Sequence, residues 1–190
     1  MSLYTLISSL KDKRRAVSKA KLLGDFLNHT KTVLDIGTGS GSFASYLKKH
    51  GFHVSTVDVV DKTIHSQINP IIYNGRELPF EDKRFEASML ITVLHHCADP
   101  DQVFAEAVRV SKKKLIVLED VYSNGVMKRL TWFMDSLVNM EFKGHPHTNK
   151  SELEWETLFE KHQLEVKKKT KTKVLAIFTQ VMYHLEKPKD

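Results

Sequence analysis

The sequence has one cysteine, Cys97, among 190 residues, and it has no long apolar run. A single cysteine excludes an internal disulfide and a cysteine-rich zinc site. No run approaches the roughly 20 apolar residues that span a bilayer. The opening MSLYTLISSLKDKRR places its basic residues after a short apolar patch, which is the reverse of a secretory signal. These absences predict a protein of a reducing compartment, the cytoplasm, without a membrane span.

Internal repeats and low-complexity linkers are also absent from the sequence. Hydrophobic residues make up 41% of the chain, enough for one buried core, and 190 residues are too few for two domains of ordinary size. We therefore predict a single domain over residues 1–190. Within it we expect a helical N-terminal segment over residues 1–30 and a helical lid or insertion over residues 121–150.

Acidic residues are outnumbered, since 29 Lys and Arg face 23 Asp and Glu and give a formal net charge of +6. The lysines gather in three clusters, at residues 11–15, 112–114 and 167–173. A basic surface can attract nucleic acid, anionic lipid or acidic substrates, but lysines also protect edge strands from association. We favour solvated loops and edge strands as the explanation, and keep a nucleic-acid partner as the alternative.

Short apolar runs alternate with helical patterns through the first two thirds of the chain. Apolar spacing predicts helices over residues 11–28 and 42–50, and a third that Asp99 or Asp101 begins and that runs to Val110. Strand-like runs cover residues 32–36, 53–60, 70–74, 85–91 and 114–120. Such alternation is typical of a parallel sheet with helices on both faces.

The end of the chain departs from this alternation. A helix over residues 151–161 opens with the capping pattern SELE, and the apolar runs QLEVKKKT and KVLAIFTQVMYHLEK follow it closely. A parallel crossover needs a dozen or more residues, so two strands this close in sequence must be antiparallel. The sequence predicts a parallel sheet that is completed by one reversed hairpin.

The stretch VLDIGTGSGSF predicts a strand that ends in a glycine loop. Its glycines are Gly37, Gly39 and Gly41, whereas the dinucleotide-binding pattern requires the third glycine at the position of Ser42. Asp35 stands at the carboxyl end of the strand, where its charge would repel a pyrophosphate and attract an ammonium group. S-adenosylmethionine carries such an ammonium group on its methionine end.

The adenosine end of that ligand requires a second acid. Asp58 closes the second predicted strand about 20 residues after the glycine loop, the distance at which an acid accepts the ribose hydroxyls. Val59 follows it and is suited to cover one face of the adenine. Taken alone, Asp58 is equally well explained as a turn or helix-cap acid, and the glycine loop in register favours the ribose.

Four motifs in this order resemble a known family: VLDIGTGSGSF, VDVVD, NGRELPFEDKRFEASMLITVLHHCADPDQVFAEAVRVSK and LIVLED. They are similar to class I S-adenosylmethionine-dependent methyltransferases and look most like the type 11 small-molecule group. The resemblance covers about residues 33–120 and extends more loosely through the closing hairpin. It implies a Rossmann-like α/β fold with a mostly parallel seven-stranded sheet, a reversed last strand and helices on both faces.

The resemblance also implies S-adenosylmethionine as cofactor, S-adenosylhomocysteine as its product, and a set of binding residues. These are Asp35, Gly37, Thr38 and Gly39 at the methionine moiety, Asp58 and Val59 at the adenosine, Asn74 and Gly75 at the adenine edge, and Ile91 and Thr92 beside the sulfur. Asn74 replaces the usual acid, and we expect its side-chain carbonyl to accept from the exocyclic amine.

His95 and His96 follow the fourth predicted strand, where the methyl acceptor is expected. Each is a candidate general base, and a structural hydrogen-bonding role is the alternative. Cys97 beside them is better explained as a small packed residue than as a nucleophile, because no paired base accompanies it.

The apolar segment over residues 121–150 predicts a lid over an acceptor pocket or a dimer contact. Trp132, His145 and His147 in this segment are candidate substrate-binding residues. A metal site built from the two histidines and Glu141 lacks a defined ligand spacing, so no metal is predicted.

These expectations describe a cytoplasmic methyltransferase that acts on a small molecule, with oxygen, nitrogen and carbon acceptors left open. The alternatives are a methyltransferase of RNA or protein, a non-catalytic S-adenosylmethionine-binding protein, and an NAD-dependent oxidoreductase. The sequence leaves open the acceptor, the use of a general base, and whether the protein is a homodimer.

Overall fold

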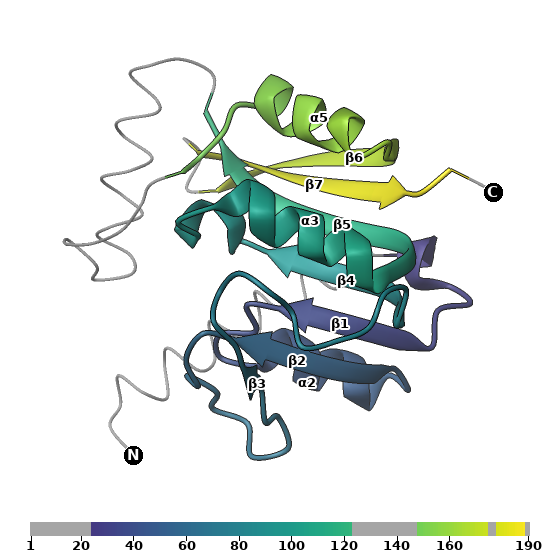
Figure 1. Ribbon diagram of the computed structural model, residues 1–190, viewed down its shortest axis with the longest axis vertical. Helices are drawn as coiled ribbons and strands as arrows, with labels where there is room; N and C mark the ends of the chain where they lie inside the picture. Colours follow the sequence, from purple (N-terminus) through teal and green to yellow (C-terminus); the bar gives the residue numbers. More distant parts are fainter. Residues whose placement is uncertain (1–23, 123–147, 175–177, 189–190) are drawn as a thin grey trace.

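The computed structural model describes residues 24–122, 148–174 and 178–188, and it builds one seven-stranded sheet from them. The strand order is β3-β2-β1-β4-β5-β7-β6 (Figure 1). The strands are β1 (Thr32–Ile36), β2 (His53–Asp58), β3 (Ile71–Ile72), β4 (Phe85–Ile91), β5 (Ser111–Val121), β6 (Glu165–Val174) and β7 (Phe178–Glu186). The first five run parallel, while β7 is antiparallel to both of its neighbours, β5 and β6. The predicted Rossmann-like sheet with its reversed last strand is confirmed.

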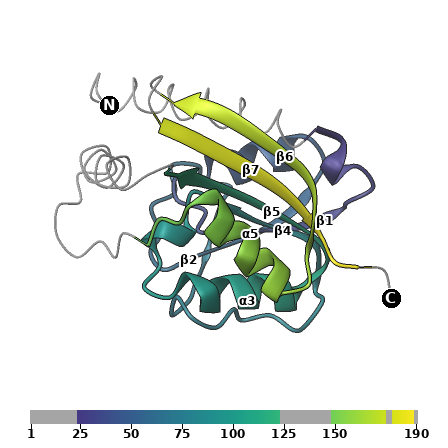
Figure 2. The same cartoon turned by 90° about the horizontal axis from the view of Figure 1, so that it is seen from above.

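Helices cover both faces of this sheet. α3 (Pro100–Val110) and α5 (Glu152–Lys161) lie on the same face, and Figure 2 shows them side by side. Their buried residues Phe104, Trp155 and Phe159 share one core cluster with Leu34 of β1. α2 (Ser42–Lys49) packs in a second cluster with Val33, the strand neighbour of Leu34. Because side chains alternate along a strand, the two clusters lie on opposite faces.

The helix starts follow the local sequence closely. Asp99 caps α3, and its side chain accepts a hydrogen bond from the amide of Gln102 at 3.0 Å. Ser151 and Glu154 form a complete capping box at the start of α5. Of the two acids predicted to begin α3, the structure selects Asp99, because Asp101 lies inside the first turn.

Several predicted boundaries differ from those of the structure. The strand expected over residues 70–74 is reduced to β3 (Ile71–Ile72), and β5 begins at Ser111 instead of residue 114. The helix expected over residues 11–28 is, in its described part, a 3-10 turn η1 (Gly24–Leu27), and residues 1–23 lie outside the described residues. The second strand was expected to reach Val60 but ends at Asp58, because the Asp58 carboxylate accepts from the amides of Val59 and Val60 and turns the chain there.

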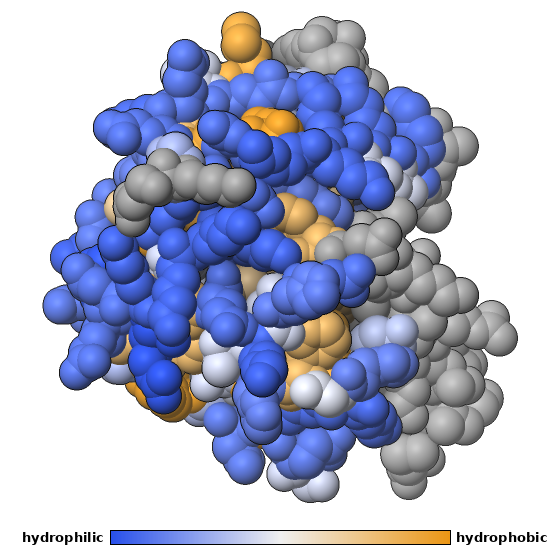
Figure 3. Space-filling model, turned by 90° about the vertical axis from the view of Figure 1, so that its right-hand side faces the viewer, coloured by the Kyte–Doolittle hydropathy of each residue, from blue (hydrophilic) through white to orange (hydrophobic). Residues whose placement is uncertain are grey.

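The lysine clusters that the structure describes lie along strands. Residues 112–114 enter β5 at the amino end of the parallel sheet, and Figure 3 shows that this side of the molecule is mostly hydrophilic. Residues 167–173 belong to β6, which is an edge strand. There Lys169 and Lys171 pair with Glu152 of α5 at 3.3 and 2.7 Å. The edge-strand explanation therefore accounts for part of the excess positive charge. Within the described residues, no helix has both the length and the apolar character that a membrane crossing requires.

Candidate functional site

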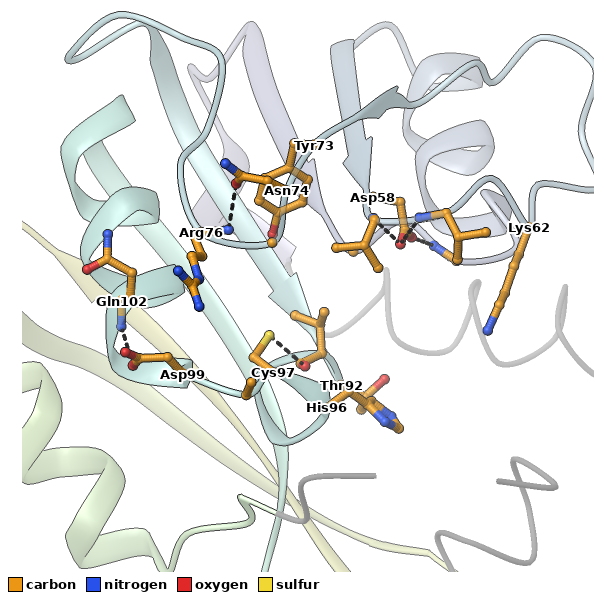
Figure 4. A pocket seen from close by; sticks show the side chains of 17 residues that line it. Asp58, Lys62, Tyr73, Asn74, Arg76, Thr92, His96, Cys97, Asp99 and Gln102 are labelled. Carbon is orange, nitrogen blue, oxygen red and sulfur yellow. Dashed lines mark hydrogen bonds between the residues drawn. The ribbon is translucent and has the colours of Figure 1, made fainter. Parts of the chain in front are cut away.

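A pocket of about 1240 Å³ opens at the carboxyl ends of β1, β2 and β4 (Figure 4). In parallel α/β sheets, ligands bind outside the carboxyl ends of the strands, where the connections leave in opposite directions. Here β1 lies between β2 and β4, which places the pocket at that point. Its lining residues are Gly37, Gly39, Asp58, Val59, Val60, Lys62, Tyr73, Asn74, Gly75, Arg76, Thr92, Val93, His96, Cys97, Ala98, Asp99 and Gln102.

The glycine loop is held tightly at its first residue. The amide of Gly37 donates to the carbonyl of Val57 in β2 at 2.9 Å, and its φ of +71° lies in the left-handed region. A Cβ atom at this position would stand 2.2 Å from Cγ2 of Val93. Only glycine therefore permits both the backbone turn and the close approach of the turn that follows β4.

Asp58 connects β2 to this loop. Its Oδ2 accepts from the amide of Gly39 at 2.8 Å and its Oδ1 accepts from the amide of Val59 at 2.8 Å. The acid thus shapes its own turn and also faces the glycine loop, so the turn explanation and the ligand explanation are not exclusive. It lines the pocket, as its place in Figure 4 shows.

Asp35 lies beneath the loop rather than in the pocket wall. The residue is 2% exposed, and its carboxylate accepts a hydrogen bond from the Thr38 hydroxyl at 2.8 Å. Burial raises the pKa of Asp35 to about 6, the negative charge of Asp58 adds to this increase, and the Thr38 hydrogen bond opposes it. Asp35 and Thr38 are both buried and neither lines the pocket.

This shift predicts a particular pH dependence of stability. Between pH 4 and pH 6 the folded chain keeps a proton on Asp35 that the unfolded chain releases, so stability falls as the pH rises through this window. Asp35→Asn has no carboxyl group to ionise at this position, so it does not lose this stability. The free energy of unfolding of the variant minus that of the wild type is therefore expected to be about 2 to 3 kcal/mol higher at pH 7 than at pH 4. Urea denaturation of both proteins at the two pH values measures the change. Parallel stability curves would show that Asp35 ionises normally.

Asn74 departs from the expectation. Its Oδ1 accepts from the amides of Arg76 and Glu77, both at 2.9 Å, which uses the two lone pairs of the carbonyl (Figure 4). The carbonyl therefore holds the turn. It is not free to accept from an adenine amine, which is the role that the sequence predicts for it. Gly75 and Val59 both line the pocket and lie close together, since a Cβ at Gly75 would be 3.2 Å from Cγ1 of Val59.

The turn after β4 supplies the opposite wall. Thr92 has a φ of +55°, which is unusual for a β-branched residue, and its amide donates to the carbonyl of Leu118 at 2.7 Å. Thr92 and Val93 line the pocket, whereas the predicted Ile91 packs against the core on the α2 face. No pattern in the sequence points to Val93, because its role follows from its contact with Gly37.

The structure separates the two candidate histidines. His96 lines the pocket, while His95 is 1% exposed and its Nδ1 is hydrogen bonded to Oε2 of Glu119. The two rings are in contact, with centroids 4.1 Å apart. Only His96 is therefore placed to reach a bound molecule.

Cys97 beside them is a packed residue, as predicted. Its Sγ donates to the carbonyl of Val93 at 3.4 Å, and burial raises the pKa of the thiol to about 12, with the charge of Glu119 as the next contribution. The candidate substrate residues Trp132, His145 and His147 lie outside the described residues.

Several pocket residues were not anticipated from the sequence. Lys62, Tyr73, Arg76 and Gln102 line it, in addition to Val60, Ala98 and Asp99. In Figure 4 the side chains of Arg76 and Gln102 lie on the side of the pocket formed by α3. Asp99 and Gln102 carry a signal that sequence could have used, because the start of a helix that follows a pocket strand lies at the same sheet edge.

Comparison with known proteins agrees with this geometry. Residues 34–117 match the family model described as a methyltransferase domain. An uncharacterized protein of Methanocaldococcus jannaschii is 34% identical over 87 residues, which are 44% of this chain and 42% of that protein. A demethylmenaquinone methyltransferase of Tropheryma whipplei is 26% identical over 125 residues, which are 60% of this chain and 51% of that protein. The chain thus matches about half the length of these curated relatives, or less.

Solved structures share the fold. A putative methyltransferase from Bacillus halodurans superposes with a TM-score of 0.73 at 15% identity, over 92% of this chain and 99% of its own. The magnesium protoporphyrin IX methyltransferase of Synechocystis, solved with bound S-adenosylhomocysteine, gives a TM-score of 0.69 at 14% identity, over 99% and 89% of the two chains. At 15% and 14% sequence identity, this similarity shows a shared fold only.

Proposed function

We propose that the protein is a class I S-adenosylmethionine-dependent methyltransferase of type 11, as the match of residues 34–117 to a methyltransferase-domain model supports, and that it transfers the methyl group of S-adenosylmethionine to a small-molecule acceptor. The observation that carries this proposal is the hydrogen bond between Asp58 and the Gly39 amide at the pocket floor. It places an acid from the end of β2 directly against the glycine loop, where the ribose hydroxyls of an adenosine ligand require an acceptor.

The charges around the loop favour this cofactor over a dinucleotide. Asp35 and Asp58 both lie at the carboxyl ends of the first two strands, and two carboxylates there oppose a pyrophosphate. A ligand that brings an ammonium group and a sulfonium is attracted instead. An NAD-dependent oxidoreductase is therefore the weaker candidate.

In this proposal different pocket residues contact different parts of the cofactor. Gly37 and Gly39 face the methionine moiety, Asp58 accepts from the ribose, and Val59 and Gly75 flank the adenine. Asp35 and Thr38 act from beneath the loop, since neither lines the pocket. Thr92 lies in the wall formed by the turn after β4, beside which we place the sulfur.

His96 is the candidate general base for an acceptor whose nucleophile must lose a proton. It is the member of the histidine pair that lines the pocket. Methyl transfer is an in-line displacement, so the site needs first to align the nucleophile with the sulfur, and a base is needed only for a protonated acceptor. An acceptor that reacts without losing a proton makes His96 dispensable.

A small acceptor is favoured over a nucleic acid by the position of the lysines. Residues 112–114 enter β5 at the amino end of the sheet, opposite the pocket, and the β6 lysines Lys169 and Lys171 are paired with α5 acids. RNA or protein methylation remains the second candidate. A cytoplasmic location and a homodimer stay predictions of the sequence.

The proposal is tested by incubating the protein with S-adenosylmethionine and a panel of phenols, amines, quinols and carboxylates, and by measuring the release of S-adenosylhomocysteine. Release with any small acceptor, and loss of the reaction in Asp58→Ala, is the expected result. Tight cofactor binding without product across this panel, but with product on RNA or protein, would assign the second candidate function.

Asn74 provides a prediction about cofactor affinity. Asp at this position keeps one oxygen for the amides of Arg76 and Glu77 and puts a second oxygen in place of the amide nitrogen, where it can accept from the adenine amine. Asn74→Asp is therefore expected to tighten S-adenosylhomocysteine binding by about 1 kcal/mol.

Isothermal titration of the wild type and the variant measures the difference. Asn74→Ala is the matched control, because it removes the turn acceptor without adding a new oxygen and should lower stability. Equal or weaker binding by Asn74→Asp would mean that the adenine amine does not face this side chain.

A further inference from the structure

A single buried carboxylate holds three consecutive residues of the turn after β4. Glu119, near the end of β5, is 0% exposed. Its Oε1 accepts from the amides of Val93 and Leu94 at 3.0 and 2.7 Å, and its Oε2 is hydrogen bonded to Nδ1 of His95. A buried charge is unfavourable unless it is well paired, so this arrangement requires all three partners to stay in place.

The turn that Glu119 holds is a strained one. Thr92 has a left-handed backbone with φ of +55°, which a β-branched residue rarely adopts. Its amide is bound by the carbonyl of Leu118, the strand neighbour of Glu119. Strained conformations persist where the surrounding structure fixes them, and they concentrate at functional sites. Two successive residues of β5 fix this one.

Glu119 is connected to the pocket through two residues of the turn. The first is Val93, whose amide donates to Glu119. Val93 also supports the glycine loop, since a Cβ at Gly37 would lie 2.2 Å from Cγ2 of Val93. The His95 ring contacts the His96 ring at 4.1 Å, and His96 lines the pocket.

We propose that Glu119 is a positioning residue of the cofactor site, which holds Val93 against the glycine loop through the backbone and orients His95 beneath His96 through Nδ1. This inference rests on the proposed function, because it assigns Glu119 a role in that same site. The carboxylate accepts only, so Nδ1 of His95 carries the proton.

Two substitutions separate the two connections. In Glu119→Gln the amide oxygen still accepts from the amides of Val93 and Leu94, so the amide nitrogen faces His95 and the proton of the imidazole moves from Nδ1 to Nε2. Glu119→Ala removes all three bonds. Nitrogen NMR of the histidine rings, recorded without ligand, reads the tautomer of His95, and isothermal titration with S-adenosylhomocysteine reads the cofactor site.

The expected results differ between the variants. Glu119→Gln inverts the His95 tautomer and shifts the His96 resonances, and its dissociation constant for S-adenosylhomocysteine rises about threefold or less, because the backbone bonds remain. In Glu119→Ala the dissociation constant rises about tenfold or more. If Glu119→Ala does not fold, the tautomer in Glu119→Gln decides the assignment of His95.

Glu106→Gln is the matched control, because Glu106 is also a buried carboxylate that holds a loop, by accepting from the Leu78 amide at 2.8 Å and pairing with Arg109. It should lower the melting temperature without changing the His95 tautomer. The proposal is overturned if folded Glu119→Ala binds S-adenosylhomocysteine as tightly as the wild type does. It is also overturned if Nδ1 of His95 is unprotonated in the wild type, or if Glu106→Gln loses as much affinity as Glu119→Ala. A wild type that binds no S-adenosylhomocysteine contradicts the proposed function instead, since the tautomer is measured without ligand.

Discussion

Gly37→Ala is expected to lower the free energy of unfolding by about 2 to 5 kcal/mol. This is the sum of the cost of a left-handed backbone for a residue with a side chain and the cost of overpacking against Val93. The added methyl group would stand 2.2 Å from Cγ2 and 2.9 Å from Cβ of Val93. Val93 cannot withdraw freely, because Glu119 holds its amide. Urea denaturation of the wild type and the variant measures the loss.

Gly39→Ala is the matched control in the same loop. Gly39 also has a positive φ, +52°, but among the described residues only Gly39 itself and its two chain neighbours have atoms within 4 Å of a Cβ built there. Only the backbone contribution of about 1 to 2 kcal/mol is therefore expected. Equal losses for the two variants would show that the contact between Val93 and the glycine loop does not restrict this position.

Asp58→Ala is expected to weaken the binding of S-adenosylmethionine by about 1 to 3 kcal/mol, because the ribose hydroxyls lose their acceptor. The structure adds a second reason, since the same carboxylate orients the Gly39 amide at 2.8 Å. The loss is measured by isothermal titration.

Asp61→Ala is the control for the change of charge. Asp61 lies in the same loop, is exposed, and accepts from the amide and hydroxyl of Thr63 at 2.9 and 2.7 Å without lining the pocket. Its removal should leave the affinity close to that of the wild type. Unchanged binding in Asp58→Ala, or an equal loss in Asp61→Ala, would mean that the acid at the end of β2 does not contact the ligand.

The sheet and the glycine loop were predictable because their causes are local in sequence. Strand and helix alternation, the capping residues Asp99 and Ser151, and the short connection in the closing hairpin each depend on neighbouring residues. The spacing of Asp58 from the loop also follows from one strand, one helix and a second strand, so its register with Gly39 could be read from the chain.

The remaining features depend on contacts between distant residues. The partner of His95 is Glu119, 24 residues away in β5, and nothing in the motif LIVLED distinguishes a buried acid from a terminal one. The carbonyl of Asn74 is taken by two amides of its own turn, a choice that depends on the local backbone and not on the residue type. Ile91 and Thr92 are adjacent, yet the left-handed backbone of Thr92 leaves only Thr92 in the pocket wall.

We propose that the pocket at the carboxyl ends of β1, β2 and β4 binds S-adenosylmethionine. Thermal denaturation with S-adenosylmethionine, S-adenosylhomocysteine or NAD tests this binding most directly, because a ligand that binds only the folded chain raises the melting temperature. We predict a rise with the two sulfur compounds that is strongly reduced in Asp58→Ala, and no rise with NAD. A rise with NAD alone would contradict the account.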